Sequence, residues 1–223
     1  MLLKERYQKV LGYFMKNGPD PETELEFTDP FELIVAVILS AQCTDKRVNM
    51  ITPLLLEAYP DANSMARATP EEIFPYIRSC TYPNCKARHL AGMATMLAER
   101  FGGKVPDDTE LLMQLPGVGR KTANVVASVI YRKPVMPVDT HVLRVSRRIG
   151  LAPKAKTPLE AEKILTANIP PDLMHNAHHW LILHGRYVCR ARDPLCNECG
   201  LKEMCSYFAS GAYREKSFKV RKF

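Results

Sequence analysis

The sequence predicts an all-α protein, and three observations support this class. Helix-start signals recur along the chain, apolar residues repeat at helical spacing, and few segments show the alternation typical of a β-strand. The connections between these segments are short. The 223 residues fit one large domain or two small ones.

The helix starts share one arrangement, in which a capping side chain precedes a proline and an acidic residue stands at the third helical position. Asp29-Pro30-Phe31-Glu32 is the first of them, and Thr69 and Thr157 begin two more. In each, the cap oxygen accepts from backbone N–H groups of the first turn that have no helical partner. A fourth helix starts at Asp107 or Asp108.

Apolar spacing supports the helices that follow these starts. Leu111, Leu112 and Leu115 share one helical face, and residues 86–100 mix Ala, Leu and Met with charged residues in a helical pattern. The run 31–39 is rich in Val and Ile and could form a strand. Its capping signal and its extension through Ser40 and Ala41 favour a helix that is buried on most sides.

The charge balance favours a polyanionic partner. The chain has 31 Lys and Arg against 24 Asp and Glu, a net charge of +7, which suits nucleic acid or an anionic membrane surface. The longest apolar run, residues 33–39, is far shorter than the roughly 20 residues of a membrane span. Met1–Arg6 has no apolar signal core. We expect a cytoplasmic monomer with no membrane partner. The basic stretch 212–223 is either a solvated end or an arm that contacts phosphate.

A glycine-containing turn separates two expected helices at residues 115–119. Gly117 and Gly119 permit a tight turn and close backbone approach. The second helix begins near Arg120, so its N–H groups point into the turn and suit a phosphate oxygen. A plain helix–helix turn is the alternative.

Lys121 and Asp139 are the candidate catalytic residues. Lys121 lies in the first turn of the second helix, where the helix dipole and Arg120 both lower the expected pKa and favour the neutral, nucleophilic amine. The alternative is a solvated lysine or a phosphate contact. Asp139 begins a further helix, so it is either an N-cap or a carboxylate that moves protons near Lys121.

Two segments together resemble the helix-hairpin-helix and Gly/Pro-Asp signature of the endonuclease III family. They are Leu-Pro-Gly-Val-Gly-Arg-Lys-Thr-Ala-Asn-Val-Val, residues 115–126, and Val-Asp-Thr-His-Val-Leu-Arg-Val, residues 138–145. The likeness runs from about Phe27 to Cys205. It implies a base excision repair enzyme that flips a damaged pyrimidine out of double-stranded DNA. Lys121 would attack C1′ and displace the base, and β-elimination would cut the strand 3′ to the abasic site, with Asp139 as the essential acid.

The resemblance also implies the domain organisation. A six-helix domain would cover residues 23–134 and hold the helix-hairpin-helix motif at about 108–131. Residues 1–22 and 135–223 would form a second helical domain with a cluster loop at 189–205. A DNA-binding cleft would separate the two domains.

Four cysteines form a metal-ligand pattern near the C-terminus. Cys189, Cys196, Cys199 and Cys205 are spaced C-x6-C-x2-C-x5-C, and four thiolates this close can bind one metal centre. The spacing alone leaves zinc and iron–sulfur open. The family resemblance implies a [4Fe–4S] cluster, to which we assign a structural role.

The resemblance extends to DNA contacts. Gln42 would fill the gap left by the flipped base, with Thr44 near the pocket. Tyr82 stands in a second DNA-probing loop where the family commonly has an aliphatic wedge, so the wedge residue is open. The full set expected to contact DNA is Gln42, Thr44, Tyr82, Pro116, Gly117, Val118, Gly119, Arg120, Thr122, His141, Arg144 and Arg186.

Cys43, Cys80 and Cys85 fall outside the metal pattern. We expect spectator thiols, with a Cys80–Cys85 redox pair as the alternative.

Three rival functions would also explain part of the sequence. A monofunctional adenine or mismatch glycosylase of the same superfamily would lack the nucleophile Lys121. A non-catalytic helix-hairpin-helix DNA-binding protein would not need Lys121 and Asp139 together. A zinc-bound interaction protein would be colourless.

Overall fold

The structure is a computed structural model that describes residues 1–18 and 20–213. Within these ranges it has twelve α-helices, two short 3-10 helices and no strand, which confirms the all-α prediction. The chain divides into two compact units, Glu22–Pro137 and the pair of segments Met1–Pro21 and Val138–Phe223. The basic stretch expected at 212–223 lies outside the described residues apart from its first two positions.

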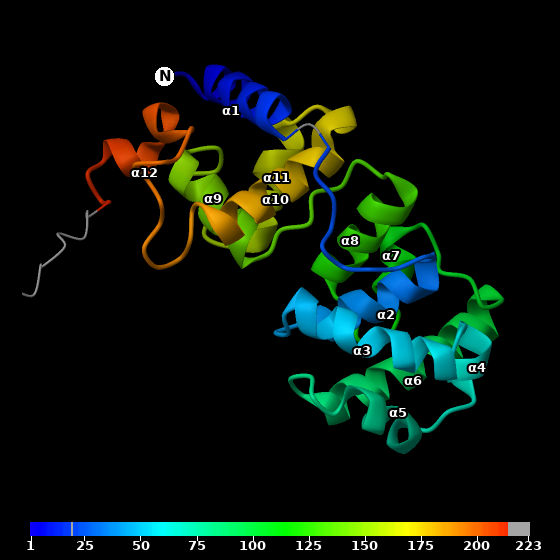
Figure 1. Ribbon diagram of the computed structural model, residues 1–223. Helices are drawn as coiled ribbons and strands as arrows, with labels where there is room; N and C mark the ends of the chain where they lie inside the picture. Colours follow the sequence, from blue (N-terminus) through cyan, green and yellow to red (C-terminus); the bar gives the residue numbers. More distant parts are fainter. Residues whose placement is uncertain (19, 214–223) are drawn as a thin grey trace, which may run out of the picture. The chain divides into compact units, whose positions relative to one another are not determined.

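The unit Glu22–Pro137 is built around one central helix. Its helices are α2 (Pro30–Ser40), α3 (Asp45–Ala58), α4 (Ala62–Ala66), α5 (Pro70–Ile77), α6 (Pro83–Phe101), α7 (Thr109–Leu112) and α8 (Arg120–Tyr131). Residues 33–39 of α2 are all buried, and α2 lies between α8 and α3 and also packs on α6 (Figure 1). The apolar run at 31–39 is therefore a helix covered on all sides, as expected, and it does not form a strand.

The expected capping residues lie at helix N-termini. The Asp29 carboxylate accepts from the Glu32 N–H at 2.8 Å, and Thr69 forms a complete capping box with Glu72. Thr157 caps α10 (Pro158–Asn168). The sequence left Asp107 and Asp108 open as the cap of α7. Asp108 is the cap, because its carboxylate accepts from the N–H groups of the first turn.

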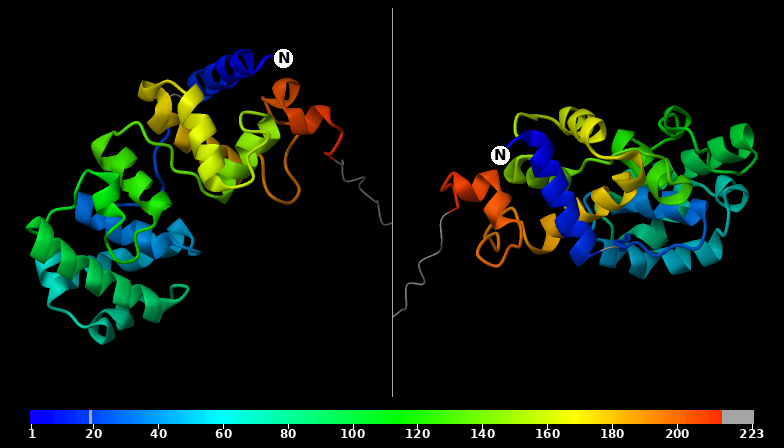
Figure 2. Two further views of the ribbon diagram at one scale, coloured as in Figure 1. Left: turned by 180° about the vertical axis from the view of Figure 1, so that it is seen from behind. Right: turned by 90° about the horizontal axis from the view of Figure 1, so that it is seen from above.

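The second unit is formed by the first and the last segments of the chain. Its helices are α1 (Leu3–Asn17), α9 (Thr140–Ile149), α10, the 3-10 turn η1 (Pro171–Leu173), α11 (Met174–Tyr187), the 3-10 turn η2 (Lys202–Met204) and α12 (Ser206–Ala209). The α1 helix lies against α11 in every view (Figure 2). There Phe14 stacks on Trp180 with ring centroids 5.7 Å apart, and the Tyr7 hydroxyl donates to the Leu151 carbonyl at 3.0 Å.

Across the described ranges, none of the helices combines the length and the apolar character that a membrane crossing requires.

Candidate functional site

The hairpin, residues 115–119, is a tight turn fixed by buried side chains and by one glycine at positive φ. Leu115 and Val118 are buried, and the Val118 N–H donates to the Leu115 carbonyl at 3.0 Å. Gly117 has φ +80°, in the left-handed region. A Cβ built on Gly117 would lie 2.8 Å from Cβ of His89 on α6. The turn therefore requires glycine at 117 for both backbone and packing reasons.

The N-terminus of α8 begins directly at this turn. Gly119 is its N-cap residue, with φ −87° and ψ 175°, and it provides no side-chain cap bond to the helix. A Cβ at Gly119 would meet nothing within 4 Å. The positive end of the helix dipole thus adjoins an open stretch of backbone, which is the arrangement that binds a phosphate oxygen.

Lys121 is the second residue of α8 and is half-buried, as is Thr122 beside it. Asn124 follows Lys121 by three positions, about one turn along the same helix, and is only 4% exposed. Its Nδ2 atom has no hydrogen-bond partner among the described residues. A buried amide without a partner typically costs about 1–3 kcal/mol, so this position is held at a cost to stability. Sequence reasoning missed Asn124, since its burial becomes apparent only in the fold.

Asp139 is the N-cap of α9. Its carboxylate accepts from the Val142 N–H at 2.8 Å, and its side chain is half-buried. The N-cap alternative raised from the sequence is therefore real, and the cap bond fixes the orientation of the carboxylate. Lys121 and Asp139 belong to different units of the chain.

The two loops that carry Gln42 and Tyr82 lie side by side within one unit. We call residues 41–44 the Gln42 loop and residues 78–82 the Tyr82 loop. Gln42 and Tyr82 both have φ +55°, which is uncommon for residues other than glycine. The Thr81 hydroxyl donates to the Gln42 carbonyl at 2.8 Å. Both Gln42 and Tyr82 are exposed, and Thr44 caps α3.

A buried lysine bonds to the backbone at the start of the Gln42 loop. Lys86 on α6 is 4% exposed, and its ammonium donates to the carbonyls of Leu39 and Ala41 at 2.8 Å each. A cation at the C-terminus of α2 neutralises the negative end of the helix dipole. Lys86 therefore anchors the start of the Gln42 loop. No feature of the sequence indicates this role, which depends on α2 and α6 meeting in space.

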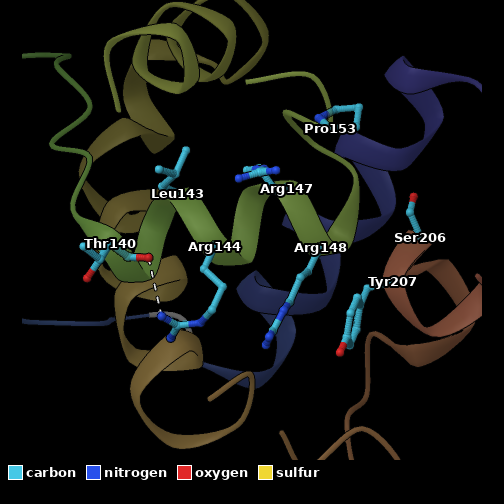
Figure 3. A pocket seen from close by; sticks show the side chains of 8 residues that line it. All are labelled: Thr140, Leu143, Arg144, Arg147, Arg148, Pro153, Ser206 and Tyr207. Atoms are coloured by element: carbon cyan, nitrogen blue, oxygen red, sulfur yellow. Dashed lines mark hydrogen bonds between the residues drawn. The ribbon is translucent and has the colours of Figure 1, made fainter. Parts of the chain in front are cut away.

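Three arginines of α9 surround an open groove of about 470 Å³, which we call the arginine groove (Figure 3). Its lining residues are Thr140, Leu143, Arg144, Arg147, Arg148, Pro153, Ser206 and Tyr207. In Figure 3 the Arg148 side chain extends beside the Tyr207 ring, and its guanidinium carbon is 4.6 Å from the ring centroid. This cation–π contact ties α9 to α12.

Arg144 and Arg148 direct most of their donors into the chain itself. Arg144 donates to the carbonyls of Cys189 at 3.1 Å and Gly185 at 2.9 Å, and burial lowers its pKa. A terminal guanidinium nitrogen of Arg144 also lies 3.2 Å from Nδ1 of His141. Arg144 thus anchors α9 to α11 and to the segment after it. Arg186, also expected to contact DNA, is half-buried on α11.

The cysteine loop, residues 189–205, brings its four sulfurs to one apolar cavity. Cys189, Cys196, Cys199 and Cys205 all line it, with leucine, valine and proline side chains between them. Arg148 donates to the Cys189 sulfur at 3.6 Å and to the Arg190 carbonyl at 2.7 Å. The loop is thus organised by an arginine from outside it, and the sequence did not reveal that partner.

Burial shifts the pKa of three groups that line this cavity, Cys196, Cys199 and His184. It raises the pKa of the Cys196 thiol to about 11, with the neighbouring cysteines adding to the shift, and it raises the pKa of Cys199 as well. His184, whose Nε2 is 3.6 Å from the Cys199 sulfur, has its pKa lowered by burial to about 4. Among the described residues, no group of three or more His, Cys, Asp or Glu side chains is arranged to hold a single metal ion.

Comparison with known proteins identifies the family. Residues 35–171 match the family described as "HhH-GPD superfamily base excision DNA repair protein". The chain is 46% identical over 200 residues to an endonuclease III of Rickettsia conorii, which covers 90% of this chain and 95% of that protein. It is 42% identical over 207 residues to the endonuclease III of Escherichia coli, with 92% and 96% covered. The protein belongs to the endonuclease III family.

A solved structure of this family has the same fold. The structure described as a trapped endonuclease III–DNA covalent intermediate superimposes with a TM-score of 0.90 at 42% identity, covering 96% of this chain and all of that one. The structure of a thermostable thymine-DNA glycosylase, at 21% identity and a TM-score of 0.83, shows the shared fold alone. The family resemblance expected from residues 115–126 and 138–145 is therefore confirmed.

Proposed function

We propose that this protein is a bifunctional DNA N-glycosylase and abasic-site lyase that removes oxidised pyrimidines from double-stranded DNA. The proposal includes a monomer that acts in the cytoplasm on nucleoid DNA. The observation that carries it is the position of Lys121, a half-buried amine in the first turn of α8 directly behind a hairpin suited to phosphate. A lysine held at a helix N-terminus is disfavoured as a cation there, and the neutral amine is the form that attacks carbon.

The proposed reaction proceeds through a covalent imine. The Lys121 amine attacks C1′ of the flipped nucleotide, and the bond from C1′ to the base breaks as the base leaves with its electron pair. The bond from C1′ to the ring oxygen O4′ then breaks, which opens the sugar ring and gives a protonated Schiff base, while O4′ takes up a proton and becomes a hydroxyl. This cation acidifies the hydrogens on C2′, so a proton is lost there and the 3′ phosphate leaves by β-elimination. Dividing the reaction in this way replaces one hard step by easier ones.

Asp139 is proposed as the second catalytic residue. Its carboxylate is oriented by the cap bond to the Val142 N–H, and a fixed carboxylate can stabilise positive charge that develops on the sugar. Proton transfer during loss of the base and opening of the ring is its other proposed task.

DNA would be held by backbone and loops together. The hairpin N–H groups and the α8 dipole suit one phosphate, and Arg120 and Thr122 flank them. Gln42 and Tyr82 are exposed on adjacent loops of the same unit, where an amide can fill an emptied base position and a phenol ring can stack. His141, Arg144 and Arg186 are the contacts proposed from the other unit.

The cysteine loop is proposed to hold a [4Fe–4S] cluster. The donor set fits this group, because four thiols and no carboxylate line one apolar cavity. A cluster is also larger than a single ion, so its ligands need not converge on one point. When bound, it would supply a rigid cross-link of four Fe–S bonds. Cys189, Cys196, Cys199 and Cys205 would be its ligands, with Arg148 placed to donate to the Cys189 sulfur.

The test uses two duplexes, one with a single thymine glycol and one with a single abasic site. Release of the base together with a nick 3′ to the lesion supports the proposal. Base release without a nick would indicate a monofunctional glycosylase. Binding without either product would indicate a non-catalytic DNA-binding protein.

A further inference from the structure

Two cysteines outside the metal pattern face each other, one from the Gln42 loop and one from the Tyr82 loop. The sulfurs of Cys43 and Cys80 are 3.9 Å apart. Cys80 is buried, whereas Cys43 is half-exposed. The sequence suggested Cys85 as the alternative partner of Cys80, but the Cys85 sulfur is exposed and lies 3.7 Å from Nε2 of His89. The pair is therefore Cys43 with Cys80, which are separated by 37 positions in the sequence.

Each cysteine belongs to one of the two loops, so the pair connects them. Cys43 follows Gln42 directly, and Cys80 is two residues before Tyr82. The loops already share the bond from the Thr81 hydroxyl to the Gln42 carbonyl. A covalent bond between the sulfurs would be a second connection within a few residues of both exposed side chains.

We propose that Cys43 and Cys80 form a reversible redox-modification site, in which a low-molecular-weight disulfide such as oxidised glutathione converts the thiol pair to a disulfide. The disulfide draws the two loops together and displaces Gln42 and Tyr82, which slows engagement of the lesion. This consequence rests on the proposed function of the two loops in DNA.

The exchange balances without any further reactant. The Cys43 thiolate attacks one sulfur of oxidised glutathione, forms a mixed disulfide and releases one glutathione thiolate. The Cys80 sulfur, after losing its proton to solvent, then attacks the Cys43 sulfur and releases the second glutathione thiolate. Two protein thiols are oxidised and one glutathione disulfide is reduced to two thiols.

The exposure of the two sulfurs sets the order of these steps. Cys43 is the accessible partner and reacts first. Burial raises the pKa of the Cys80 thiol to about 11, and the nearby Cys43 adds to the shift, while Lys86 and Arg47 oppose it. Cys80 is thus mainly a protonated thiol at neutral pH, which leaves Cys43 as the first nucleophile.

Closing the bond requires the two sulfurs to approach each other, by rotation of the two side chains together with movement of the loops that carry them. A disulfide has its sulfurs about 2.05 Å apart, so the observed 3.9 Å must shorten. Behind the loops, the chain is fixed by the Cys80 N–H to the Ile77 carbonyl and by the Lys86 ammonium on Leu39 and Ala41. The displacement therefore falls on the exposed parts of the loops, which carry Gln42 and Tyr82.

The experiment treats the purified holoenzyme with oxidised glutathione and measures two quantities. Intact mass and peptide mapping without reductant report the disulfide, as a loss of about 2 mass units and a cross-linked peptide pair. Single-turnover cutting of a thymine glycol duplex reports its consequence. Cys43→Ser is the test variant, and Cys85→Ser is the matched control, since Cys85 is exposed and lies in the same region. Loss of the cluster during treatment would slow all three proteins equally.

The expected result is a Cys43–Cys80 cross-link in wild type and Cys85→Ser, with cutting slowed about tenfold or more, as small misplacements near a reacting site can do. Dithiothreitol restores the rate, and Cys43→Ser forms no cross-link and cuts at the same rate before and after its own treatment. Absence of the cross-link, or a cross-link that leaves cutting unchanged, overturns the proposal. The cutting activity of the reduced wild-type protein tests the proposed function separately from the disulfide. If it does not cut, the proposed function fails, and the loss of function in the oxidised state is overturned with it, although the mass data still report whether the disulfide forms.

Discussion

The hairpin and the cysteine loop hold their shapes by different means. The hairpin is supported by the apolar core, since Leu115 and Val118 are buried and Gly117 packs on His89. The cysteine loop has few buried apolar side chains of its own and is held by Arg144 and Arg148, which donate to its backbone carbonyls. Packing thus fixes the hairpin, whereas in the cysteine loop the packing of Leu201 and of Gly200 against Tyr13 is joined by these arginine hydrogen bonds.

Because of this difference, substitutions in the two segments should affect different properties of the protein. A site placed on a packed turn can lose its reactive group and still fold, because the packing of Leu115, Gly117 and Val118 holds the turn. A loop built around four thiols depends on what those thiols bind. We therefore expect changes near the hairpin to alter activity selectively, and changes in the cysteine loop to alter folding first.

The largest expected effect is that of Lys121→Ala on strand cutting. Removing a covalent nucleophile typically costs at least about 10⁴-fold in rate, and the small side chain leaves α8 intact. The thermal midpoint and the affinity for lesion DNA should change little. Lys133→Ala is the matched control, because Lys133 is a surface lysine of the same unit that pairs with Asp107 at 2.8 Å. Substantial residual cutting by Lys121→Ala would remove it as the nucleophile.

The next effect is that of Cys199→Ser on the unit that contains the cysteine loop. Loss of one of four ligands should destabilise this unit by on the order of 3 kcal/mol or more, because metal-binding free energy contributes directly to folding. Urea unfolding and the visible absorption of the cluster measure this together. A soluble, colourless variant with full activity would contradict the structural role of the cluster.

A pair of glycine variants tests whether the hairpin is fixed by packing. Gly117→Ala should destabilise the protein by about 2–3 kcal/mol, since alanine is strained at positive φ and its Cβ would strike His89. Gly119→Ala has open space and φ −87°, so it should cost less, about 0.5–1 kcal/mol, because alanine is a poorer N-cap than glycine. Its affinity for DNA should fall if phosphate approaches the backbone there. Equal thermal midpoints for the two variants would show that the turn is not held by packing.

The smallest effect is expected for Arg148→Lys. The variant keeps the charge but loses the planar fork that donates to the carbonyls of Arg190 and Ala191. We expect a loss of about 1–2 kcal/mol in stability, measured by urea unfolding. Arg147→Lys, one position earlier and exposed, should show almost none. A similar loss in both would mean that the guanidinium bonds do not organise the loop.

The sequence predicted the parts of the fold that depend on local chemistry. Asp29, Thr69 and Thr157 signal their helices because capping needs only nearby backbone. The choice between Asp107 and Asp108 could not be made in advance, because either carboxylate precedes the same turn. The position of the hairpin was likewise readable from Gly117 and Gly119.

The remaining features depend on segments that meet only after folding. Lys86 reads as an ordinary charge on α6, and its burial under the Gln42 loop depends on where α2 ends. The contact of Cys43 with Cys80 joins two loops that are far apart in the chain, whereas sequence proximity pointed to Cys85. The roles of Lys121 and Asp139 came from the family resemblance and stay proposals until they are measured.

The most direct test of the central claim is borohydride trapping on a duplex with one thymine glycol. If Lys121 forms a Schiff base, reduction should give a covalent protein–DNA adduct whose cross-linked peptide contains Lys121. The adduct should disappear in Lys121→Ala and persist in Lys133→Ala. An adduct that persists in Lys121→Ala, or no adduct on either thymine glycol or abasic DNA, would contradict the proposed mechanism.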